Sequence, residues 1–332
     1  MNSEIRTGND PLLEVKTHIP IRGEKEFGRK RLIEWIERKP QRVVVFQAAA
    51  GFGKTTAMAE LAQKNKGCCG WYQISETDNC PRNFLNGIRA AVKDAADDIP
   101  LQKFGQDDDG IADTCRQFLA EFFMRIRERK FYLCFDNFHL ISNETVIWMI
   151  VWLIECRAKE LRLVFTVDGS LPAFLSACLL LRQILTVHAE RLIFSEQEVK
   201  LLLDGTERDD YTSEQISAIW QYTGGWPAGL AFLCSGMKAE QADLSHFNKT
   251  HLYQYIFHEV FQKFPNDIQM VLIQLSAFGE MDETVCNEAL GRDDCGRLLE
   301  YLYREYHMVY RESSGRYRYY LLYADFLMQR LT

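Results

Sequence analysis

The stretch Ala48-Ala49-Ala50-Gly51-Phe52-Gly53-Lys54-Thr55 decides the fold of this 332-residue chain. It follows Val43–Gln47, a short β-branched run that is typical of a buried strand. It precedes a helical pattern over Thr55–Lys66. A loop of small residues between a strand and a helix is the setting of a phosphate loop, or Walker A motif, because backbone N–H groups there can hold phosphate oxygens.

The residue types of the loop each have a chemical reason. Gly51 and Gly53 permit the tight backbone path, Lys54 places a positive charge against the phosphates, and Thr55 offers its hydroxyl to Mg²⁺. The first glycine of the usual pattern is Ala48 here, and the other positions keep the pattern. The structural alternative is a strand, turn and helix with a surface lysine. The flanking strand and helix favour phosphate binding.

A second candidate site follows the apolar run Phe131–Phe135. Asp136 comes directly after this predicted strand, where a nucleoside triphosphatase needs a carboxylate for the Mg²⁺ shell. The alternative is a strand-end carboxylate that caps a turn. Many such enzymes carry a second acid next, which polarises the attacking water, but the residue here is Asn137. An amide cannot accept a proton, and loss of a general base costs about 10²–10⁴-fold in rate.

Hydrophobic patterns predict how the rest of the chain is organised. Alternating strands and helices to about residue 195 predict a doubly wound parallel sheet covered on both faces. Ser195 and Glu198 form a capping-box pattern that opens an all-helical region. A hairpin signal over Met308–Arg311 and Arg316–Tyr319, followed by a closing helix, predicts a winged helix. The remaining expected strands are Gly70–Ile74, Leu161–Val167 and Arg191–Phe194, the last of them after a helix over Leu175–Leu185.

Composition narrows the class of protein. Apolar residues are 47% and charged residues 26% of the chain, which is ordinary for a globular protein. A net charge of −7 argues against a domain that works on nucleic acid. The longest apolar run, Val146–Ile154, is too short to cross a membrane, and none of the ten cysteines forms a C-x-x-C pair. We therefore expect a cytoplasmic protein with free thiols and no membrane segment.

Short motifs along the chain carry a family resemblance. Ala50–Thr56 is similar to A-G-[FY]-G-K-T-T, Phe135–His139 to a D-[DN]-[YF]-H box, and Gly224–Leu230 to E-G-W-P-A-G-L. The chain thereby resembles the N-terminal ATPase module of large LuxR-type transcriptional regulators of the MalT kind, which belong to the signal-transduction ATPases with numerous domains (STAND). Shorter matches lie at Arg29–Leu32, Gly70–Tyr72 with Asp78–Asn79, and Tyr317–Tyr319 with Ala324–Leu327.

The resemblance covers about residues 12–332 and implies a domain order. It implies an N-terminal extension over 1–17, a P-loop nucleotide-binding domain over 18–195, a helical lid over 196–250 and a winged helix over 251–332. Sensor repeats and a LuxR-type helix-turn-helix follow downstream in the family. The implied fold class is therefore an α/β P-loop NTPase with a parallel sheet, like STAND and AAA+ proteins, followed by a helical domain and a winged helix.

The resemblance also implies a switch that binds ATP or ADP with Mg²⁺. The ADP form rests, the ATP form is active and self-associates, and DNA is bound only through the downstream domain. For Arg29 and Arg31 a solvated helix face is the alternative, and for Pro227 an ordinary helix start. The implied residues are Ala50, Gly51, Phe52, Gly53, Lys54, Thr55, Thr56, Arg29, Arg31 and Pro227 for the nucleotide, Thr55 and Asp136 for Mg²⁺, and Asp136 and Asn137 for catalysis.

Two departures from the family pattern bear on hydrolysis. Asp168 stands where many members carry an arginine that senses the γ-phosphate, and Tyr320 and Leu321 occupy the stretch of a histidine that can touch the diphosphate. With Asn137, these changes predict slow or impaired hydrolysis while nucleotide binding is kept. Two other classes stay open: an active ATPase or P-loop kinase, and a degenerate P-loop scaffold that mediates protein contacts only.

Overall fold

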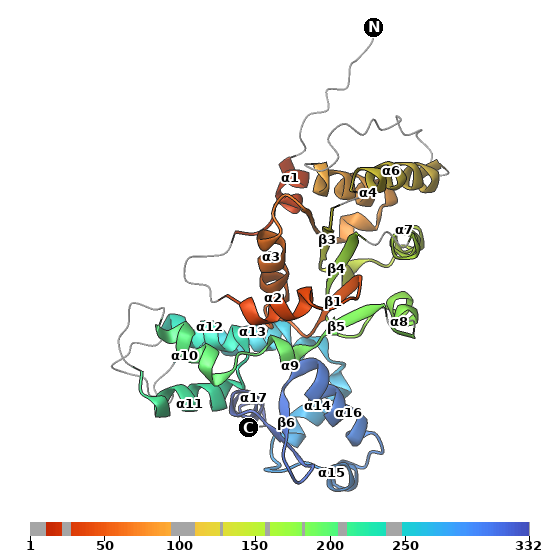
Figure 1. Cartoon of the computed structure of the whole chain (residues 1–332). Coiled ribbons are helices and arrows are strands. Elements are labelled where there is room, and N and C mark those ends of the chain that lie inside the picture. Colours follow the sequence, from red (N-terminus) through yellow and green to blue (C-terminus); the bar gives the residue numbers. More distant parts are fainter. Residues whose placement is uncertain are drawn as a thin grey trace. The chain divides into compact units, whose positions relative to one another are not determined.

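The computed structural model of the chain (Figure 1) describes residues 11–21, 28–93, 110–126, 129–156, 160–180, 183–204, 211–236 and 248–331. The chain divides into two compact units, which we describe separately. The first unit comprises Met1–Arg22, Gly28–Phe46 and Thr55–Val187. The second unit comprises Gly23–Phe27, Gln47–Lys54 and His188–Thr332.

A five-stranded sheet organises the first unit, in the order β2-β3-β4-β1-β5. The pairs β1 with β5, β2 with β3, and β3 with β4 are parallel. Strands β1, β3 and β4 are buried along their whole length, which explains why their sequences are mostly apolar. The strands are β1 (Val43–Gln47), β2 (Cys69–Gln73), β3 (Phe131–Asp136), β4 (Leu161–Val167) and β5 (Ile184–Val187).

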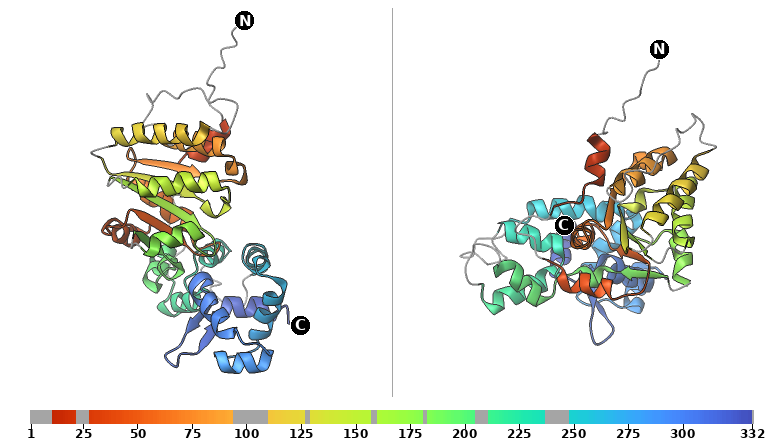
Figure 2. Two further views of the ribbon diagram at one scale, coloured as in Figure 1. Left: turned by 90° about the vertical axis from the view of Figure 1, so that its right-hand side faces the viewer. Right: turned by 45° about the horizontal axis from the view of Figure 1, so that its top comes forward.

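Helices cover the sheet on both faces, as Figure 1 shows for α7 and α8 on one side and α3 on the other. One hydrophobic cluster joins the sheet to α4, α6 and α7. Helices α6 and α7 lie side by side (Figure 2), with Phe123 stacked on Trp152 at 6.1 Å. The helices of this unit are α1 (Pro11–Thr17), α2 (Lys30–Glu37), α3 (Lys54–Lys64), α4 (Pro81–Ala91), α6 (Ile111–Arg125), α7 (Glu144–Glu155) and α8 (Ala173–Leu180), with 3-10 turns η1 (Glu76–Asn79) and η3 (Phe138–Leu140).

A stack of aromatic rings fixes the carboxyl end of β3. Phe135 stacks on Phe84 at 5.9 Å and on Phe165 at 5.3 Å between ring centroids. Phe138 meets Phe165 edge-on at 4.9 Å. All four rings are fully buried, so the backbone that carries the next residue, Asp136, is held on both sides. The predicted α/β class with a parallel sheet is confirmed, and the phosphate-loop segment directly follows β1 as expected.

The fifth strand was predicted wrongly. We expected Arg191–Phe194 as the strand and Leu175–Leu185 as a helix, but α8 ends at Leu180 and β5 is Ile184–Val187. The leucine-rich run extends a helical pattern too far, while the β-branched residues of Ile184–Val187 suit an extended edge strand beside β1. Residues 189–192 form the short helix α9 instead, and Phe194 donates its N–H to the Gly225 carbonyl (2.8 Å).

The second unit contains helices and one antiparallel hairpin. The hairpin β6–β7 pairs Val309 with Tyr319, at the predicted position. The predicted capping box is also present, with the Ser195 N–H donating to the Glu198 carboxylate (2.9 Å). The elements are α9 (Ala189–Leu192), α10 (Glu196–Asp204), α11 (Ser213–Thr223), α12 (Pro227–Gly236), α13 (Thr250–Glu259), η6 (Phe261–Lys263), α14 (Asn266–Leu275), α15 (Glu283–Leu290), α16 (Cys295–Tyr301), η7 (Leu302–Tyr306), β6 (Val309–Arg311), β7 (Tyr317–Tyr319) and α17 (Leu321–Met328).

The described helices include none that is both long and apolar enough to cross a bilayer. The domain boundaries at residues 17, 195 and 250 stay a prediction.

Candidate nucleotide-binding site

The phosphate loop lies between β1 and α3 and has the tight path that its glycines allow. Gly51 and Gly53 have φ angles of +81° and +70°, a region that residues with a Cβ rarely adopt. Lys54 is 7% exposed, and its Nζ donates to the Ala49 carbonyl at 2.8 Å. The side-chain amine of Lys54 therefore lies against the loop that precedes it.

Free backbone donors are the feature of this loop that suits an anion. Within the described part of the chain, the N–H groups of Ala50, Gly51 and Gly53 donate to no acceptor. Backbone N–H groups that lack a partner are costly unless water or a ligand satisfies them. Successive N–H groups on a loop with left-handed glycines form an anion-binding concavity. This is the arrangement that phosphate oxygens require.

The first unit holds a hydroxyl and a carboxylate together at the ends of its strands. Asp136 is fully buried, and its Oδ1 accepts hydrogen bonds from Thr55 (2.9 Å) and Thr166 (2.6 Å). Oxygen ligands of this kind suit Mg²⁺, which keeps several waters and binds few protein carboxylates. No cluster of three or more histidine, cysteine, aspartate or glutamate side chains suitable for a metal occurs in the described ranges. The pair Thr55 and Asp136 therefore fits Mg²⁺ better than a metal held by protein ligands alone.

The residue that follows Asp136 is an amide, Asn137, and not a second acid. Asn137 has a left-handed backbone (φ 59°), which asparagine tolerates, and its N–H donates to the Thr166 hydroxyl at 2.8 Å. Asp168 follows β4, and its N–H donates to His139 Nδ1 at 3.3 Å. The position after β3 thus carries an amide that cannot accept a proton, and its effect on hydrolysis stays a prediction.

In the second unit, the start of α12 packs on the phosphate loop. The Ala228 N–H donates to the Gly51 carbonyl at 3.0 Å. A Cβ placed on Gly51 would lie 2.7 Å from Trp226 Cζ2, and one on Gly53 would lie 3.9 Å from Pro227 Cβ. The structure therefore places Pro227 beside the loop. It adds Trp226, whose ring is fully buried.

A segment just before the β6–β7 hairpin also contacts the loop, and no sequence pattern marked it. The Ala49 N–H donates to the Glu305 carbonyl at 3.1 Å, and the Gln47 side chain donates to the Glu305 carboxylate at 2.8 Å. Burial raises the pKa of Glu305. The His307 ring meets Phe52 edge-on at 6.5 Å. Glu305 and His307 belong to no motif, so only the three-dimensional structure reveals them.

His307 is an unusual buried histidine. It is 5% exposed, and its ring is hydrogen-bonded to the backbone of Gly224. Its ring lies 4.9 Å from that of Tyr320. Burial lowers the pKa of His307 to about 4, so the ring is neutral at pH 7.

The other predicted binding residues are placed as follows. Arg29 is buried, and its backbone N–H donates to Glu60 at 2.7 Å. Arg31 is exposed on α2, which agrees with a solvated helix face. Thr56 is exposed in the first turn of α3, and Ala50 is half-buried. The part that these four residues take in nucleotide binding stays a prediction.

Comparison with known proteins gives one family match and a set of distant relatives. Residues 257–332 match the model of the MalT winged helix domain. The chain is 26% identical over 325 residues to the HTH-type transcriptional regulator MalT of Vibrio cholerae, covering 93% of this chain and 35% of that protein. It is 26% identical over 332 residues to the MalT regulator of Serratia proteamaculans, covering 96% of this chain and 36% of that protein.

The chain therefore spans about a third of the length of the curated relatives it matches. Among solved structures, a variant of Thermotoga maritima RuvB aligns with 88% of this chain and 92% of its own, at a TM-score of 0.39 and 13% identity. The Aeropyrum pernix ORC2 protein, in ADPNP–ADP complexes, aligns with 99% of this chain and 95% of its own, at a TM-score of 0.45 and 12% identity. The predicted winged helix is confirmed, and the similarity to MalT-type regulators runs along almost the whole chain.

Proposed function

We propose that this chain is the ATP- and ADP-binding switch module of a MalT-like transcriptional regulator of the LuxR family. The observation that carries the proposal is the phosphate loop itself. Its N–H groups at Ala50, Gly51 and Gly53 are free of acceptors in the described ranges, and Thr55 at its end meets the Asp136 carboxylate. Free loop donors joined to a hydroxyl and a carboxylate suit a nucleotide phosphate chain with Mg²⁺.

The residues would have different roles in binding. The loop N–H groups would donate hydrogen bonds to phosphate oxygens, and Lys54 would offset the negative charge of these oxygens. Thr55 and Asp136 would hold Mg²⁺. When bound, Mg²⁺ supplies positive charge to the phosphate oxygens. Asn137 stands at the position where active enzymes carry a general base, and its amide cannot accept a proton. We therefore infer slow or impaired hydrolysis of ATP. A long-lived nucleotide suits a switch better than it suits an enzyme with fast turnover.

Hydrogen bonds between the phosphate loop and two other segments of the second unit support the switch proposal. The Gly51 carbonyl accepts from Ala228 on α12, and the Ala49 N–H donates to Glu305 before the hairpin. A change in the loop between nucleotide states would alter these bonds, and a conformational equilibrium shifts only through such differential contacts. Self-association of the ATP form then follows as the family resemblance implies.

Two of the three arginines of the hairpin are paired with carboxylates. Arg316 and Arg318 both pair with Glu280, and Arg318 also pairs with Glu312 at 2.7 Å. Neutralised arginines contribute little to phosphate-backbone binding, which depends on uncompensated positive charge. We therefore assign the regulator's DNA binding to a separate helix-turn-helix domain, and to this chain a cytoplasmic role in binding nucleotide and transmitting its state.

The test is mass spectrometry of nucleotide released when the purified chain is denatured, beside a Lys54→Ala variant of equal circular dichroism. ADP or ATP is expected with the native sequence and not with the variant. The same chains are then titrated with Mg-ADP and Mg-ATP while thermal unfolding is followed. A chain that carries no nucleotide and is stabilised by neither would overturn the proposal in favour of a scaffold. Fast turnover sensitive to Asp136→Ala would identify an active ATPase instead.

A further inference from the structure

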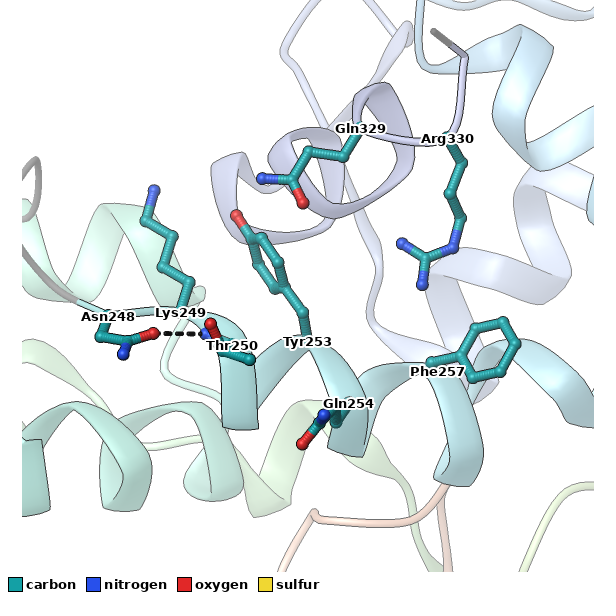
Figure 3. Close-up of a pocket in the computed structure, with 8 residues that line it drawn as sticks. All are labelled: Asn248, Lys249, Thr250, Tyr253, Gln254, Phe257, Gln329 and Arg330. Carbon is teal, nitrogen blue, oxygen red and sulfur yellow. Dashed lines mark hydrogen bonds between the residues drawn. The ribbon is translucent and has the colours of Figure 1, made fainter.

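A pocket in the second unit lies apart from the phosphate loop, between the first turns of α13 and the residues that follow α17 (Figure 3). Its volume is about 580 Å³, which falls in the range of roughly 300–1,000 Å³ typical of small-molecule sites. Polar side chains and the ring of Phe257 line it, and none of its described lining residues is acidic. The pocket therefore combines hydrogen-bonding groups with one apolar wall.

Positive charge in this pocket exceeds negative charge. Lys249 is paired, since its Nζ lies 2.8 Å from Asp325 Oδ2. Arg330 has no carboxylate partner in the part of the chain that the structure describes; its guanidinium stacks on Phe326 at 3.8 Å and donates to the Phe326 carbonyl. Desolvation lowers the pKa of Arg330, and the guanidinium also lies over the rings of Phe257 (5.0 Å) and Phe261 (5.6 Å). The N-terminus of the ten-residue helix α13 adds the positive end of a helix dipole.

A buried tyrosine forms part of the wall of the same pocket. Tyr253 is 8% exposed, and its hydroxyl is hydrogen-bonded to that of Tyr222. The Tyr222 hydroxyl in turn donates to Asp325 (3.1 Å). Figure 3 shows the Tyr253 hydroxyl directed to the side of the pocket where Gln329 lies. The Tyr253 ring is therefore held in place beside the pocket.

We propose that the pocket binds a small anionic molecule through a phosphate or carboxylate group. Arg330 supplies the charge and a planar pair of N–H donors, a geometry that matches both groups. The rings of Tyr253 and Phe257 pack against the apolar part of the molecule. A cationic ligand is disfavoured by the excess positive charge, and a neutral one leaves Arg330 uncompensated.

The experiment titrates the full chain with phenyl phosphate, benzoate and neutral benzyl alcohol at constant ionic strength, and follows binding by ligand-observed NMR and calorimetry. Arg330→Gln is expected to weaken binding of the preferred anion by at least about tenfold, because it removes a charge-assisted hydrogen bond. The matched control is Arg297→Gln, which removes an exposed guanidinium on α16 and is expected to change nothing.

The outcomes separate this pocket from the phosphate loop and the two ligand types from each other. Binding that persists in Lys54→Ala and is lost in Arg330→Gln supports the pocket, and the reverse pattern overturns it. Preference for phenyl phosphate or for benzoate identifies the group. Saturable binding of neither anion at millimolar concentration, or equal binding of benzyl alcohol, overturns the proposal.

Discussion

Replacement of Gly51 by alanine tests the packing of α12 on the phosphate loop. At Gly51 the new Cβ would lie 2.7 Å from Trp226 Cζ2 and 2.8 Å from Ala228 Cβ, closer than real Cβ contacts come. Overpacking of this kind costs about 1–3 kcal/mol. The left-handed backbone (φ +81°) adds about 1–2 kcal/mol for any residue with a Cβ. The expected loss in the free energy of unfolding is therefore about 2–5 kcal/mol.

The same loop offers a matched control. Gly53 has a similar left-handed backbone (φ +70°), but a Cβ there would only come within 3.9 Å of Pro227 Cβ, an ordinary contact. Gly53→Ala should therefore cost the backbone term alone, about 1–2 kcal/mol. The difference between the two variants isolates the contact with Trp226 and Ala228.

The assay is urea denaturation of both variants, followed by tryptophan fluorescence and circular dichroism, with hydrogen exchange of the Ala228 N–H as a local measurement. That N–H donates to the Gly51 carbonyl at 3.0 Å, so its exchange should quicken in Gly51→Ala and not in Gly53→Ala. In a double-mutant cycle, Trp226→Leu should lessen the cost of Gly51→Ala, because residues in contact are not additive. Equal destabilisation by the two alanines, or full additivity with Trp226→Leu, would refute the packing argument.

Three further predictions concern the strand ends and the buried histidine. Asn137→Asp should raise steady-state phosphate release from ATP by about 10²-fold, because it supplies the missing proton acceptor. Asp136→Asn is the inactive control. An unchanged rate in Asn137→Asp would contradict the role given to Asn137. Thr166→Val should lower the free energy of unfolding by about 1–3 kcal/mol, as measured by denaturant titration. The substitution removes the 2.6 Å hydrogen bond to Asp136 and the acceptor of the Asn137 N–H. Thr166→Ser keeps the hydroxyl and is the control. The His307 pKa of about 4 lies below its ordinary 6.5, so the unfolded chain takes up the proton first and stability falls as pH falls from 6.5 to 4. The loss reaches about 3 kcal/mol at the acid end, and His307→Asn should abolish this part of the pH dependence in thermal unfolding.

Local sequence patterns were enough to predict the loop after β1 and the carboxylate at the end of β3. The phosphate loop is a contiguous run of small residues, and Asp136 directly follows a continuous apolar strand. Both features depend on residues that are neighbours in the chain, so composition and spacing carry them. The parallel sheet brings Thr55 and Asp136 together as expected, because the carboxyl ends of parallel strands meet at one edge.

The rest of the candidate site could not be predicted because its contacts join distant segments. Gln47 and Glu305 are 258 residues apart in the chain, and neither belongs to a pattern that marks a site. Near the hairpin, the family pattern predicted only that Tyr320 and Leu321 replace a histidine. The structure shows Tyr320 packed on a different histidine, His307, with ring centroids 4.9 Å apart. A ring contact of this kind cannot be predicted from a single sequence.

The loop's backbone groups fall into two sets, and this division constrains how the proposed switch can work. The Ala49 N–H and the Gly51 carbonyl are bonded to Glu305 and Ala228 of the second unit, whereas the N–H groups of Ala50, Gly51 and Gly53 have no acceptor in the described ranges. A phosphate can therefore be bound without breaking the bonds that hold the loop to its protein partners. Nucleotide state must act through a shift of the loop backbone, which both sets share, and not through competition for one donor.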